Sequence, residues 1–455
     1  MTARSAAPPR GTEPRPAPAP QPLIVDACAG VAGLGAGAVL AAVIANESRG
    51  ALAAPGGVLT TAGRFAGFSG AYLMLIMVVL VARLPWLERS VGQERLVRWH
   101  RRVSPWALGL IVTHVLAITL GYAQAGRTGW LRQLWVLLRS YPDILAAVAG
   151  FGLLVLAGVT SYRYVRRRLR YGTWWVVHLY LYLGLALAFT HQLVTGVAFV
   201  GHPLVRALWI AIWAATAGLV LAFRIGQPVR RSLRHRLRVV EVRQEAPGVV
   251  SVICQGRRLE ELPVSGGQFV LWRFLARDLW WQAHPYSLSA LPRPPYLRVT
   301  IKAVGDQSRA VARLRPGTRV AIEGPYGAFT RHARAAPGVA LVGAGVGVTP
   351  LRALLEDLPA GTDLVVVLRA PATLELIHRQ EIAALVKQHG GRLHEVTGPR
   401  HEARFDARAL GYLIPDLAAR DVYVCGPDGF SALVTDAALR LGAAPARIHC
   451  EAFAF

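Results

Sequence analysis

The chain of 455 residues is 53% hydrophobic, and its positive mean hydropathy favours a membrane protein of two or three domains over a soluble one. The net charge of +25 does not indicate nucleic-acid binding, because much of the arginine lies in short loops beside apolar segments. Cys28, Cys254, Cys425 and Cys450 are too few and too scattered for a disulfide framework or a zinc site.

The amino-terminal half contains six apolar segments behind a tail. Residues 1–22 are rich in Pro, Ala and Arg and are expected to be a disordered tail that lacks the apolar centre of a signal peptide. Each apolar segment is near the ~20 residues that span a bilayer core. The segments lie near residues 23–45, 65–82, 104–124, 143–162, 173–195 and 204–224. We therefore expect a six-helix, all-α transmembrane domain over residues 23–224, in contact with membrane lipid.

The arginines between these segments predict the orientation of the chain. The second and third segments are separated by an arginine-rich loop, as are the fourth and fifth, whereas the opposite loops carry few arginines. The residues are Arg83, Arg89, Arg95, Arg98, Arg101 and Arg102 in one loop, and Arg163, Arg166, Arg167, Arg168 and Arg170 in the other. By the positive-inside rule both loops and both termini are cytoplasmic, which predicts a multi-pass protein of the plasma (inner) membrane.

Two of the apolar segments carry two histidines each. His100 and His114 are fourteen residues apart, and His178 and His191 are thirteen apart, which is about 20 Å in a helix. The predicted orientation places His100 with His178 near the cytoplasmic side and His114 with His191 near the outer side. Since an axial histidine on each face commonly holds haem iron, this pattern predicts two haems stacked across the membrane.

The histidines have an alternative interpretation, and the geometry has one weakness. Intramembrane histidines also hydrogen-bond to neighbouring helices or relay protons. A fourteen-residue spacing returns to within about 40° of the same helix face, but thirteen residues miss it by about 140°. The second histidine helix must therefore tilt, distort or present its haems on different flanks. His202 has no partner of this kind and is expected at the surface.

After about Arg224 the sequence changes to short alternating strands. In Tyr296–Val304 the apolar residues face one way and the polar residues the other, which predicts half-buried strands in the first lobe of a soluble domain. The stretch HPYSLSA, His284–Ala290, precedes this strand. GDQS, Gly305–Ser308, closes it and opens a helix whose backbone N–H groups suit a phosphate, although an ordinary helix N-cap is the alternative.

From residue 336 onward, a strand, a glycine loop, a helix and a further strand predict an α/β nucleotide-binding domain over residues 336–455. Gly343, Gly345 and Gly347 would allow close approach of a pyrophosphate. Thr349 is expected to cap the following helix, with Pro350 at its first position.

The end of the next strand bears on the choice of nucleotide. Arg369 stands where an acid would bind the ribose of NADH, and therefore suits the 2′-phosphate of NADPH. Arg379 is a second candidate for that phosphate. The alternative is an arginine that simply ends a strand in solvent.

Two further stretches stand near the carboxyl terminus. Cys425 ends an apolar strand before the turn formed by Gly426 and Pro427, where such a domain presents ligand, although a lone buried cysteine is more often a packing residue. The terminal stretch IHCEAFAF ends on aromatic residues, which must be covered or stack on something flat.

Together, these motifs resemble the ferredoxin–NADP⁺ reductase superfamily fused to a ferric-reductase-type transmembrane domain, the architecture of NADPH oxidases and ferric-chelate reductases. The resemblance covers about residues 64–455. It rests on HPYSLS, GDQS, GPYG at Gly324–Gly327, the glycine loop with its Thr-Pro, CGP and the four histidines. His284 in place of the arginine of soluble members favours the oxidase-like branch.

The resemblance implies that residues 225–335 form an antiparallel β-barrel domain that binds FAD, and it implies roles for individual residues. Ser287, Cys425 and Glu451 would be catalytic. His284 and Pro285 would bind the flavin phosphates, Tyr286 the ribityl or isoalloxazine, Ser287 the N5 region, and Gly305 with Ser308 the pyrophosphate. Cys425 would lie by the nicotinamide. Glu451 and Phe453 match the Glu-x-aromatic that covers the flavin, with Phe455 as the second choice.

The expected activity is transmembrane electron transfer from NADPH through FAD and two bis-histidine b-type haems to a ferric chelate or oxygen on the outer face. One departure affects oxygen: Ile118 stands where eukaryotic NADPH oxidases have a further histidine. The alternatives are a haem-free, membrane-anchored flavin reductase and a non-enzymatic haem- or metal-handling membrane protein.

Overall fold

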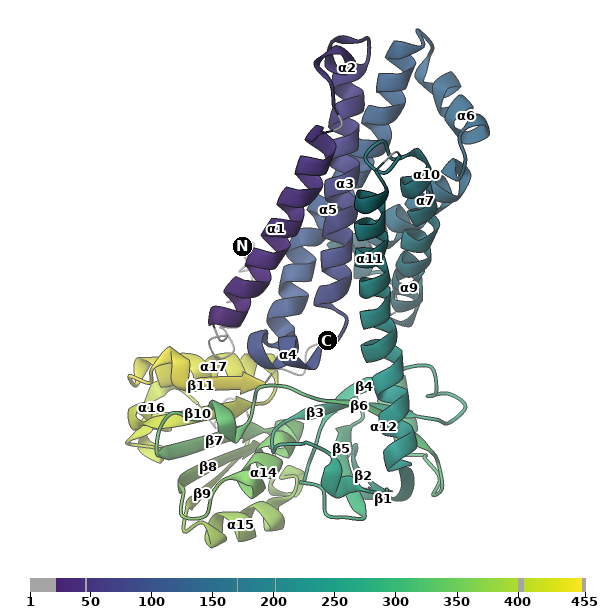
Figure 1. Cartoon of the computed structure of the whole chain (residues 1–455). Helices are drawn as coiled ribbons and strands as arrows, with labels where there is room; N and C mark the ends of the chain where they lie inside the picture. The colour runs from purple at the N-terminus through teal and green to yellow at the C-terminus, as the bar shows by residue number, and fades with distance from the viewer. Residues whose placement is uncertain (1–21, 46, 170, 201, 400–404, 452–455) are drawn as a thin grey trace, which may run out of the picture. The chain divides into compact units, whose positions relative to one another are not determined.

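The computed structural model describes residues 22–45, 47–169, 171–200, 202–399 and 405–451 (Figure 1). Its contacts divide these residues into two compact units, which meet in the chain between Ile225 and Gly226. The first unit is helical, and the second contains all the described strands. The predicted order of six apolar helices, an antiparallel β domain and an α/β domain is confirmed.

The helical unit has six helices that are long and apolar enough to cross a membrane. Their elements are α1 (Pro22–Ala45), α3 (Gly57–Leu80), α5 (Gln93–Ala125), α7 (Ile144–Ser161), α9 (Tyr171–Leu187) with α10 (Phe189–Thr195), and α11 (Pro203–Val220). Shorter helices lie in the connections: α2 (Arg49–Ala53), α4 (Pro85–Val91), α6 (Trp130–Ser140) and α8 (Arg163–Arg166). A one-turn π-helix, Leu221–Gly226, joins α11 to α12 (Gln227–His235).

Two predicted helix starts were wrong. The third apolar helix begins at Gln93 rather than near residue 104, and Pro105 lies inside it. A proline inside a helix leaves a carbonyl without its donor, and membrane helices tolerate this where side chains satisfy the freed backbone. The second apolar helix begins at Gly57 rather than near residue 65. The longer third helix carries His100 and His114 on one continuous element.

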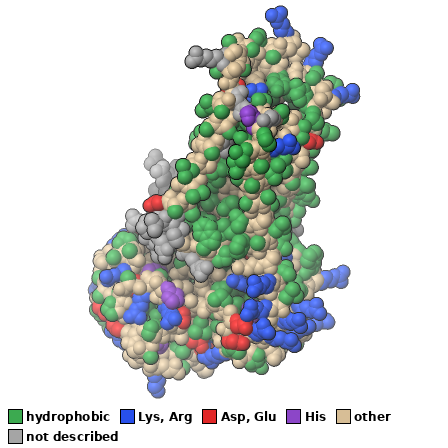
Figure 2. Space-filling view, viewed as in Figure 1, with side chains coloured by type: hydrophobic (Ala, Val, Ile, Leu, Met, Phe, Trp, Pro, Cys, Tyr) green, Lys and Arg blue, Asp and Glu red, His purple; other side chains and the backbone are tan. Residues whose placement is uncertain are grey.

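The outer surface of the helical unit is apolar, as a lipid-facing surface must be. Large side chains such as Leu34, Leu145 and Leu204 are 78%, 69% and 71% exposed. Figure 2 shows hydrophobic side chains along much of the visible helix surface, with charged side chains gathered toward the helix ends. Exposed apolar area on this scale is unfavourable in water, and it supports a multi-pass membrane protein.

The first half of the second unit is a six-stranded antiparallel barrel. Its strands are β1 (Arg238–Ala246), β2 (Val249–Gln255), β3 (Phe269–Phe274), β4 (His284–Ser287), β5 (Tyr296–Lys302) and β6 (Val320–Tyr326). They form two three-stranded sheets, β1-β2-β5 and β4-β3-β6. Bridges between Leu288 and Val299 and between Arg238 and Arg319 join the two sheets at both edges. The helix α13 (Asp306–Val311) follows β5.

The second half is a doubly wound α/β fold around a parallel sheet of order β11-β10-β7-β8-β9. Its strands are β7 (Gly338–Ala344), β8 (Asp363–Ala370), β9 (Arg392–Thr397), β10 (Arg420–Cys425) and β11 (Ile448–Glu451). One face of the sheet packs on α14 (Val348–Asp357) and α15 (Arg379–Gln388). The other face packs on α16 (Ala407–Leu413) and α17 (Asp428–Arg440).

The barrel and the α/β lobe are joined by buried polar contacts. The expected alternation of β5 is present, but Thr300 on its polar face is buried, because its hydroxyl bonds to His378 Nε2 at 2.9 Å. Beside it, Glu381 of α15 accepts hydrogen bonds from Arg298 of β5 at 2.7 and 2.8 Å and from Arg352 of α14 at 2.8 Å. Burial opposes ionisation of Glu381, yet these cationic partners hold its pKa far below its usual range.

Replacing the carboxylate at the centre of this contact should loosen the two lobes. Glu381→Gln removes charge-assisted hydrogen bonds, and for a partly exposed group we expect a loss of roughly 1–2 kcal/mol. The melting temperature of the reductase part should fall by about 2–8 °C at neutral pH. Thermal unfolding of the purified full chain, followed by tryptophan fluorescence, measures this shift.

The pH dependence has a definite sign. Because the pKa of Glu381 is depressed in the folded state, its contribution is present above about pH 4.3 and is lost as the pH falls further. The difference between wild type and Glu381→Gln should therefore shrink in acid. Asp436→Asn is the control, since the exposed Asp436–Arg440 pair contributes about 0–1 kcal/mol. Equal melting temperatures for the two variants would contradict the assigned role of Glu381.

Candidate functional site

The four intramembrane histidines form two pairs. The rings of His100 and His178 have centroids 6.3 Å apart, and those of His114 and His191 are 6.5 Å apart. His100 and His114 come from α5, whereas His178 lies on α9 and His191 on α10. These are the same two pairs that the sequence predicts.

The separation of the paired rings suits a metal ion between them. The ring separations would allow one metal ion to be held by the two imidazoles of each pair, since histidine nitrogens bind metals at about 2.0 Å. Among the residues that the structure describes, no group of three or more His, Cys, Asp or Glu side chains lies close enough to hold a metal. Two histidines at each site would be enough to hold a haem iron, so the residues fit haem.

Hydrogen bonds at Nδ1 orient three of the four imidazoles. His100 Nδ1 lies 3.2 Å from the carbonyl of Met77, and His114 Nδ1 lies 2.8 Å from the carbonyl of Gly63. His178 Nδ1 lies 3.4 Å from the hydroxyl of Ser161. An Nδ1–H that donates to oxygen fixes the tautomer and leaves Nε2 as the ligand atom.

His191 differs, since its buried Nδ1 has no hydrogen-bond partner among the described residues. The helix that should carry it is interrupted: α9 ends at Leu187 and α10 begins at Phe189. The break lies between His178 and His191, where the thirteen-residue spacing requires a distortion. Gln192 donates to the carbonyl of Ala188 at 2.8 Å and accepts from Trp209 Nε1 at 3.0 Å, which holds the interrupted turn.

Sequence reasoning missed the residues that position these rings. A Cβ on Gly67 of α3 would lie 2.5 Å from His114 Nδ1, so only glycine allows α3 to approach this imidazole. His178 stacks on Trp174 with centroids 5.1 Å apart, and Trp174 Nε1 donates to Ser161 at 3.1 Å. The repeated glycines of α3, at positions 63, 67 and 70, were the available signal.

The predicted flavin residues lie on β4 and α13. His284 and Tyr286 project from β4 with ring centroids 6.0 Å apart, and Trp272 Nε1 donates to the carbonyl of Tyr286 at 3.2 Å. Burial lowers the pKa of His284, a shift that Gln307 opposes, and it raises the pKa of Tyr286 to about 12. Both side chains are therefore neutral near pH 7.

Unsatisfied polar atoms at this place fit a polar ligand. Within the described chain, His284 Nε2 and Gln307 Oε1 are buried and make no hydrogen bond of ordinary geometry, although the two side chains lie close enough for Gln307 to act on His284. Such orphaned groups in a native fold call for a ligand or ordered water. The Ser308 hydroxyl, in contrast, is used by the protein, since it accepts from the backbone N–H groups of Val304 and Gly305 at 2.9 Å. Ser308 therefore shapes the GDQS turn.

The glycine loop departs from the prediction in two respects. The helix α14 begins at Val348 after a 3₁₀ turn, Gly345–Gly347, so Thr349 is not its cap and Pro350 is not its first residue. Thr349 is buried, and its hydroxyl donates to Val346 O at 2.8 Å. A Cβ on Gly347 would lie 2.3 Å from the carbonyl of Cys425, whereas Gly345 has φ +56° and open space beside it. Gly345 is thus the glycine that leaves room for a ligand.

The strand register brings the remaining predicted residues to one edge. Glu451 pairs with Cys425, and Cys425 pairs with Gly343, all at the carboxyl ends of parallel strands. Ligands bind at this edge in doubly wound folds. Cys425 is fully buried, and burial together with Glu451 raises the pKa of its thiol well above the usual value. Gly426 and Pro427 follow it, while Phe453 and Phe455 lie outside the described residues.

The two candidate arginines for a 2′-phosphate differ in their surroundings. Arg369 ends β8 but is only 7% exposed, and its guanidinium donates to the carbonyls of Gly398 at 2.6 Å and Val396 at 3.4 Å. It also donates to the carbonyl of Ala370. The Arg379 side chain is 50% exposed and pairs with Glu395 at 2.8 Å. Arg369 is thus engaged by backbone, whereas Arg379 remains accessible.

Comparisons with known proteins cover both units. The family described as "Ferric reductase like transmembrane component" matches residues 66–189. "FAD-binding domain" matches residues 236–330, and "Oxidoreductase NAD-binding domain" matches residues 341–436.

Curated relatives match mainly by part of their length. The NADPH oxidoreductase of Mycobacterium tuberculosis is 28% identical over 240 residues, which are 50% of this chain and 63% of that protein, so less than two thirds of its length is matched. Ferredoxin--NADP reductase B of Sorangium cellulosum is 31% identical over 188 residues, 37% of this chain and 77% of that protein. NADPH oxidase 1 of Mus musculus is 28% identical over 166 residues, 35% of this chain and 26% of that protein.

The matches fall in the order that the motifs predict, with the membrane component before the two reductase domains. The chain therefore belongs to the family in which a ferric reductase-like transmembrane component is fused to ferredoxin–NADP⁺ reductase-type FAD- and NAD-binding domains, the architecture of NADPH oxidases and ferric-chelate reductases.

Proposed function

We propose that this chain is an NADPH-dependent oxidoreductase that transfers electrons through FAD and two b-type haems to an acceptor on the other side of a membrane. The observation that carries the proposal is the pairing of four intramembrane histidines at ring separations of 6.3 and 6.5 Å. Ionisable residues within membrane spans are seldom retained without a function, and matched pairs at two depths provide two stations for electrons.

Different residues of the chain would bind each of the three cofactors. FAD, when bound, accepts two electrons as hydride and releases them singly, as haem iron requires. His284 and Tyr286 would bind and orient the flavin from β4, and Cys425 and Glu451 would line the nicotinamide side at the sheet edge. Cys425 remains a neutral thiol there, which avoids a charge beside the reacting ring. His100 with His178 and His114 with His191 would hold the inner and outer haems.

The arginine-rich loops support a cytoplasmic reductase in the plasma (inner) membrane, with both termini on the cytoplasmic side. The outer histidine pair then lies nearer the acceptor. The acceptor is a ferric chelate or oxygen. Ile118 on α5 leaves the outer site without the additional histidine that the resemblance associates with oxygen reduction, which favours ferric chelate.

Two other functions give different measurements. A haem-free, membrane-anchored flavin reductase would lack the Soret absorption band of haem. A non-enzymatic haem- or metal-handling membrane protein would not retain flavin. The buried, unpartnered Nε2 of His284 among the described residues and the open space at Gly345 support nucleotide binding over the second alternative.

Removing an outer histidine should separate the two halves of the electron path. His114→Ala removes one proposed ligand of the outer haem and leaves the reductase lobes unchanged. Haem content per folded protein should fall toward half, and reduction of an outer acceptor should collapse. Reduction of a soluble dye by NADPH should stay near the wild-type rate. Haem absorbance, dye reduction and outer ferricyanide reduction in sealed vesicles measure the three quantities.

His202→Ala is the matched control. The predicted topology places His202 on the outer side, like His114, and it is exposed and belongs to neither pair. It should leave haem content and transfer unchanged. If the four histidines are only packing residues, His114→Ala protein that folds will keep its full haem content and its transmembrane activity, and the ligand assignment is then wrong.

The source of NADPH preference is testable with two arginines. We expect Arg379→Ala to raise the KM for NADPH by about tenfold or more and to leave the KM for NADH unchanged, since a charge-assisted phosphate contact contributes roughly 1.5–3 kcal/mol. Arg369→Ala should weaken both nucleotides alike, because it removes backbone support at the end of β8. If Arg369→Ala instead raises the KM for NADPH and leaves the KM for NADH unchanged, the phosphate contact belongs to Arg369.

The acceptor can be identified with the purified protein. Given NADPH, it should reduce a ferric chelate faster than it forms superoxide, because Ile118 replaces a histidine at the outer site. Fe(II) and superoxide are measured separately, under anaerobic and aerobic conditions. Superoxide formation that accounts for most of the NADPH consumed in the presence of the chelate would assign oxygen as the acceptor.

A further inference from the structure

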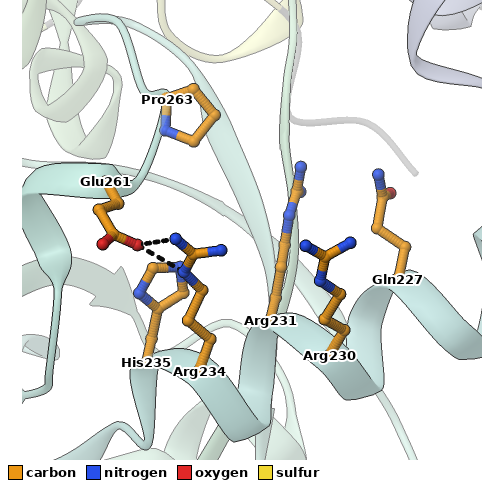
Figure 3. A pocket seen from close by; sticks show the side chains of 7 residues that line it. All are labelled: Gln227, Arg230, Arg231, Arg234, His235, Glu261 and Pro263. Atoms are coloured by element: carbon orange, nitrogen blue, oxygen red, sulfur yellow. Dashed lines mark hydrogen bonds and ion pairs between the residues drawn. The ribbon is translucent and has the colours of Figure 1, made fainter.

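The helix α12 forms a basic pocket directly after the last apolar helix. The pocket has a volume of about 230 Å³ and is lined by Gln227, Arg230, Arg231, Arg234, His235, Glu261 and Pro263. Figure 3 shows the side chains of Arg230 and Arg231 rising side by side from α12, with Arg234 turned toward Glu261. Figure 2 shows Lys and Arg side chains gathered over this region of the reductase unit.

The three arginines differ in how available they are to a ligand. Arg234 pairs with Glu261, which neutralises it within the protein. Arg231 is half-buried, and Glu323 and Tyr326 of β6 act on its charge, whereas Arg230 is exposed at the pocket. A guanidinium presents a planar fork of donors that matches phosphate oxygens. The pocket therefore has the charge and donors for a phosphate-bearing anion.

Contacts with the barrel hold α12 in place. The Ser232 hydroxyl accepts a hydrogen bond from the backbone N–H of Ile322 in β6 at 3.3 Å. The buried His235 places Nδ1 3.1 Å from the carbonyl of Arg257. The arginines are thus presented from a helix that is fixed to the reductase, which reduces the entropy lost when they bind.

The opposite side of α12 is apolar and uncovered. Val229 and Leu233 are 50% and 64% exposed. They stand four residues apart, and the same spacing continues back to Ile225 and Leu221, which are also exposed. An exposed apolar stripe beside arginines characterises helices that lie at a membrane surface, with the apolar face toward acyl chains and the basic face toward anionic headgroups.

The position of α12 in the chain is consistent with a headgroup ligand. The apolar run of α11 and its π-helical turn ends near Arg224, and Arg230 follows six residues later, which is about 9 Å along a helix. The interfacial layer on each side of a bilayer core is about 5–8 Å thick. Since an arginine side chain can reach back several ångströms, Arg230 and Arg231 lie within reach of lipid phosphates.

We propose that the α12 pocket binds the phosphate of an anionic phospholipid, with Arg230 and Arg231 as the phosphate contacts and the exposed Ile225 and Val229 toward the acyl region. Basic clusters immediately after a transmembrane helix commonly bind anionic lipids. The exposed apolar stripe favours a lipid over a soluble phosphate, which would have no use for it. Such binding concerns neither the histidine pairs nor the nucleotide site, so it is independent of the proposed electron transfer.

The test uses the purified full chain in a neutral detergent, titrated with fluorescently labelled phosphatidylglycerol and, for comparison, labelled phosphatidylcholine. Wild type should prefer phosphatidylglycerol. The double variant Arg230→Gln/Arg231→Gln should bind it about tenfold or more weakly, because each basic residue near an anionic lipid contributes a comparable share of the attraction. Phosphatidylcholine binding should not change. Arg440→Gln, which removes an exposed arginine from α17, should behave as wild type.

Further variants keep the result interpretable. NADPH-dependent dye reduction should be unchanged in the double variant, which shows that it is folded. If it does not fold, the single variant Arg230→Gln and the charge-preserving Arg230→Lys/Arg231→Lys serve instead, with partial loss expected in the first and most binding retained in the second. Equal phosphatidylglycerol binding in folded wild type and glutamine variants would overturn the proposal. Displacement of the labelled lipid by inorganic phosphate at matched ionic strength would also overturn it, in favour of a soluble anion.

Discussion

The distance between two imidazole rings on different helices is the constraint on which the rest of the helical unit depends. His100 and His114 of α5 lie beside His178 and His191, with ring centroids 6.3 and 6.5 Å apart. Glycines let the neighbouring helices pack closely against the helices that carry the histidines. Gly63 and Gly67 bring α3 against α5, and Gly150 and Gly184 bring α7 against α9. These helix pairs therefore stand as two supports on either side of the histidines.

In the reductase unit, the constraint is that the FAD-binding lobe and the NAD-binding lobe must keep a fixed position relative to each other. Ala246, Val249 and Phe329 of the barrel lobe pack into the apolar core of the α/β lobe. Directional contacts are added by the ionised groups around Glu381 and by the buried hydrogen bond between Thr300 and His378. Directional bonds fix the relative position of the lobes, because they weaken when distance or angle changes. The proposed flavin residues on β4 and the carboxyl edge of the sheet are thereby held in a constant relative position.

The chain between the two units adds a third requirement, since α12 belongs to the barrel but follows directly from a membrane helix. One side of α12 contacts the barrel through hydrogen bonds of Ser232 and His235. Val229 and Leu233 of the same helix remain exposed. Exposed apolar residues beside arginines are typical of helices at a membrane surface. The proposed lipid contact accounts for this combination.

The sequence by itself determined the element order, the histidine pairing and the edge that collects Gly343, Cys425 and Glu451, because hydropathy, spacing and strand ends are local patterns. Tertiary structure alone decided how individual side chains are used. The guanidinium of Arg369 donates its hydrogen bonds to backbone carbonyls. Only glycine fits at position 347, because the backbone of Cys425 lies against it. The helix before His191 is interrupted at Ala188. Each outcome depends on which distant segment packs alongside, and no local pattern encodes that neighbour.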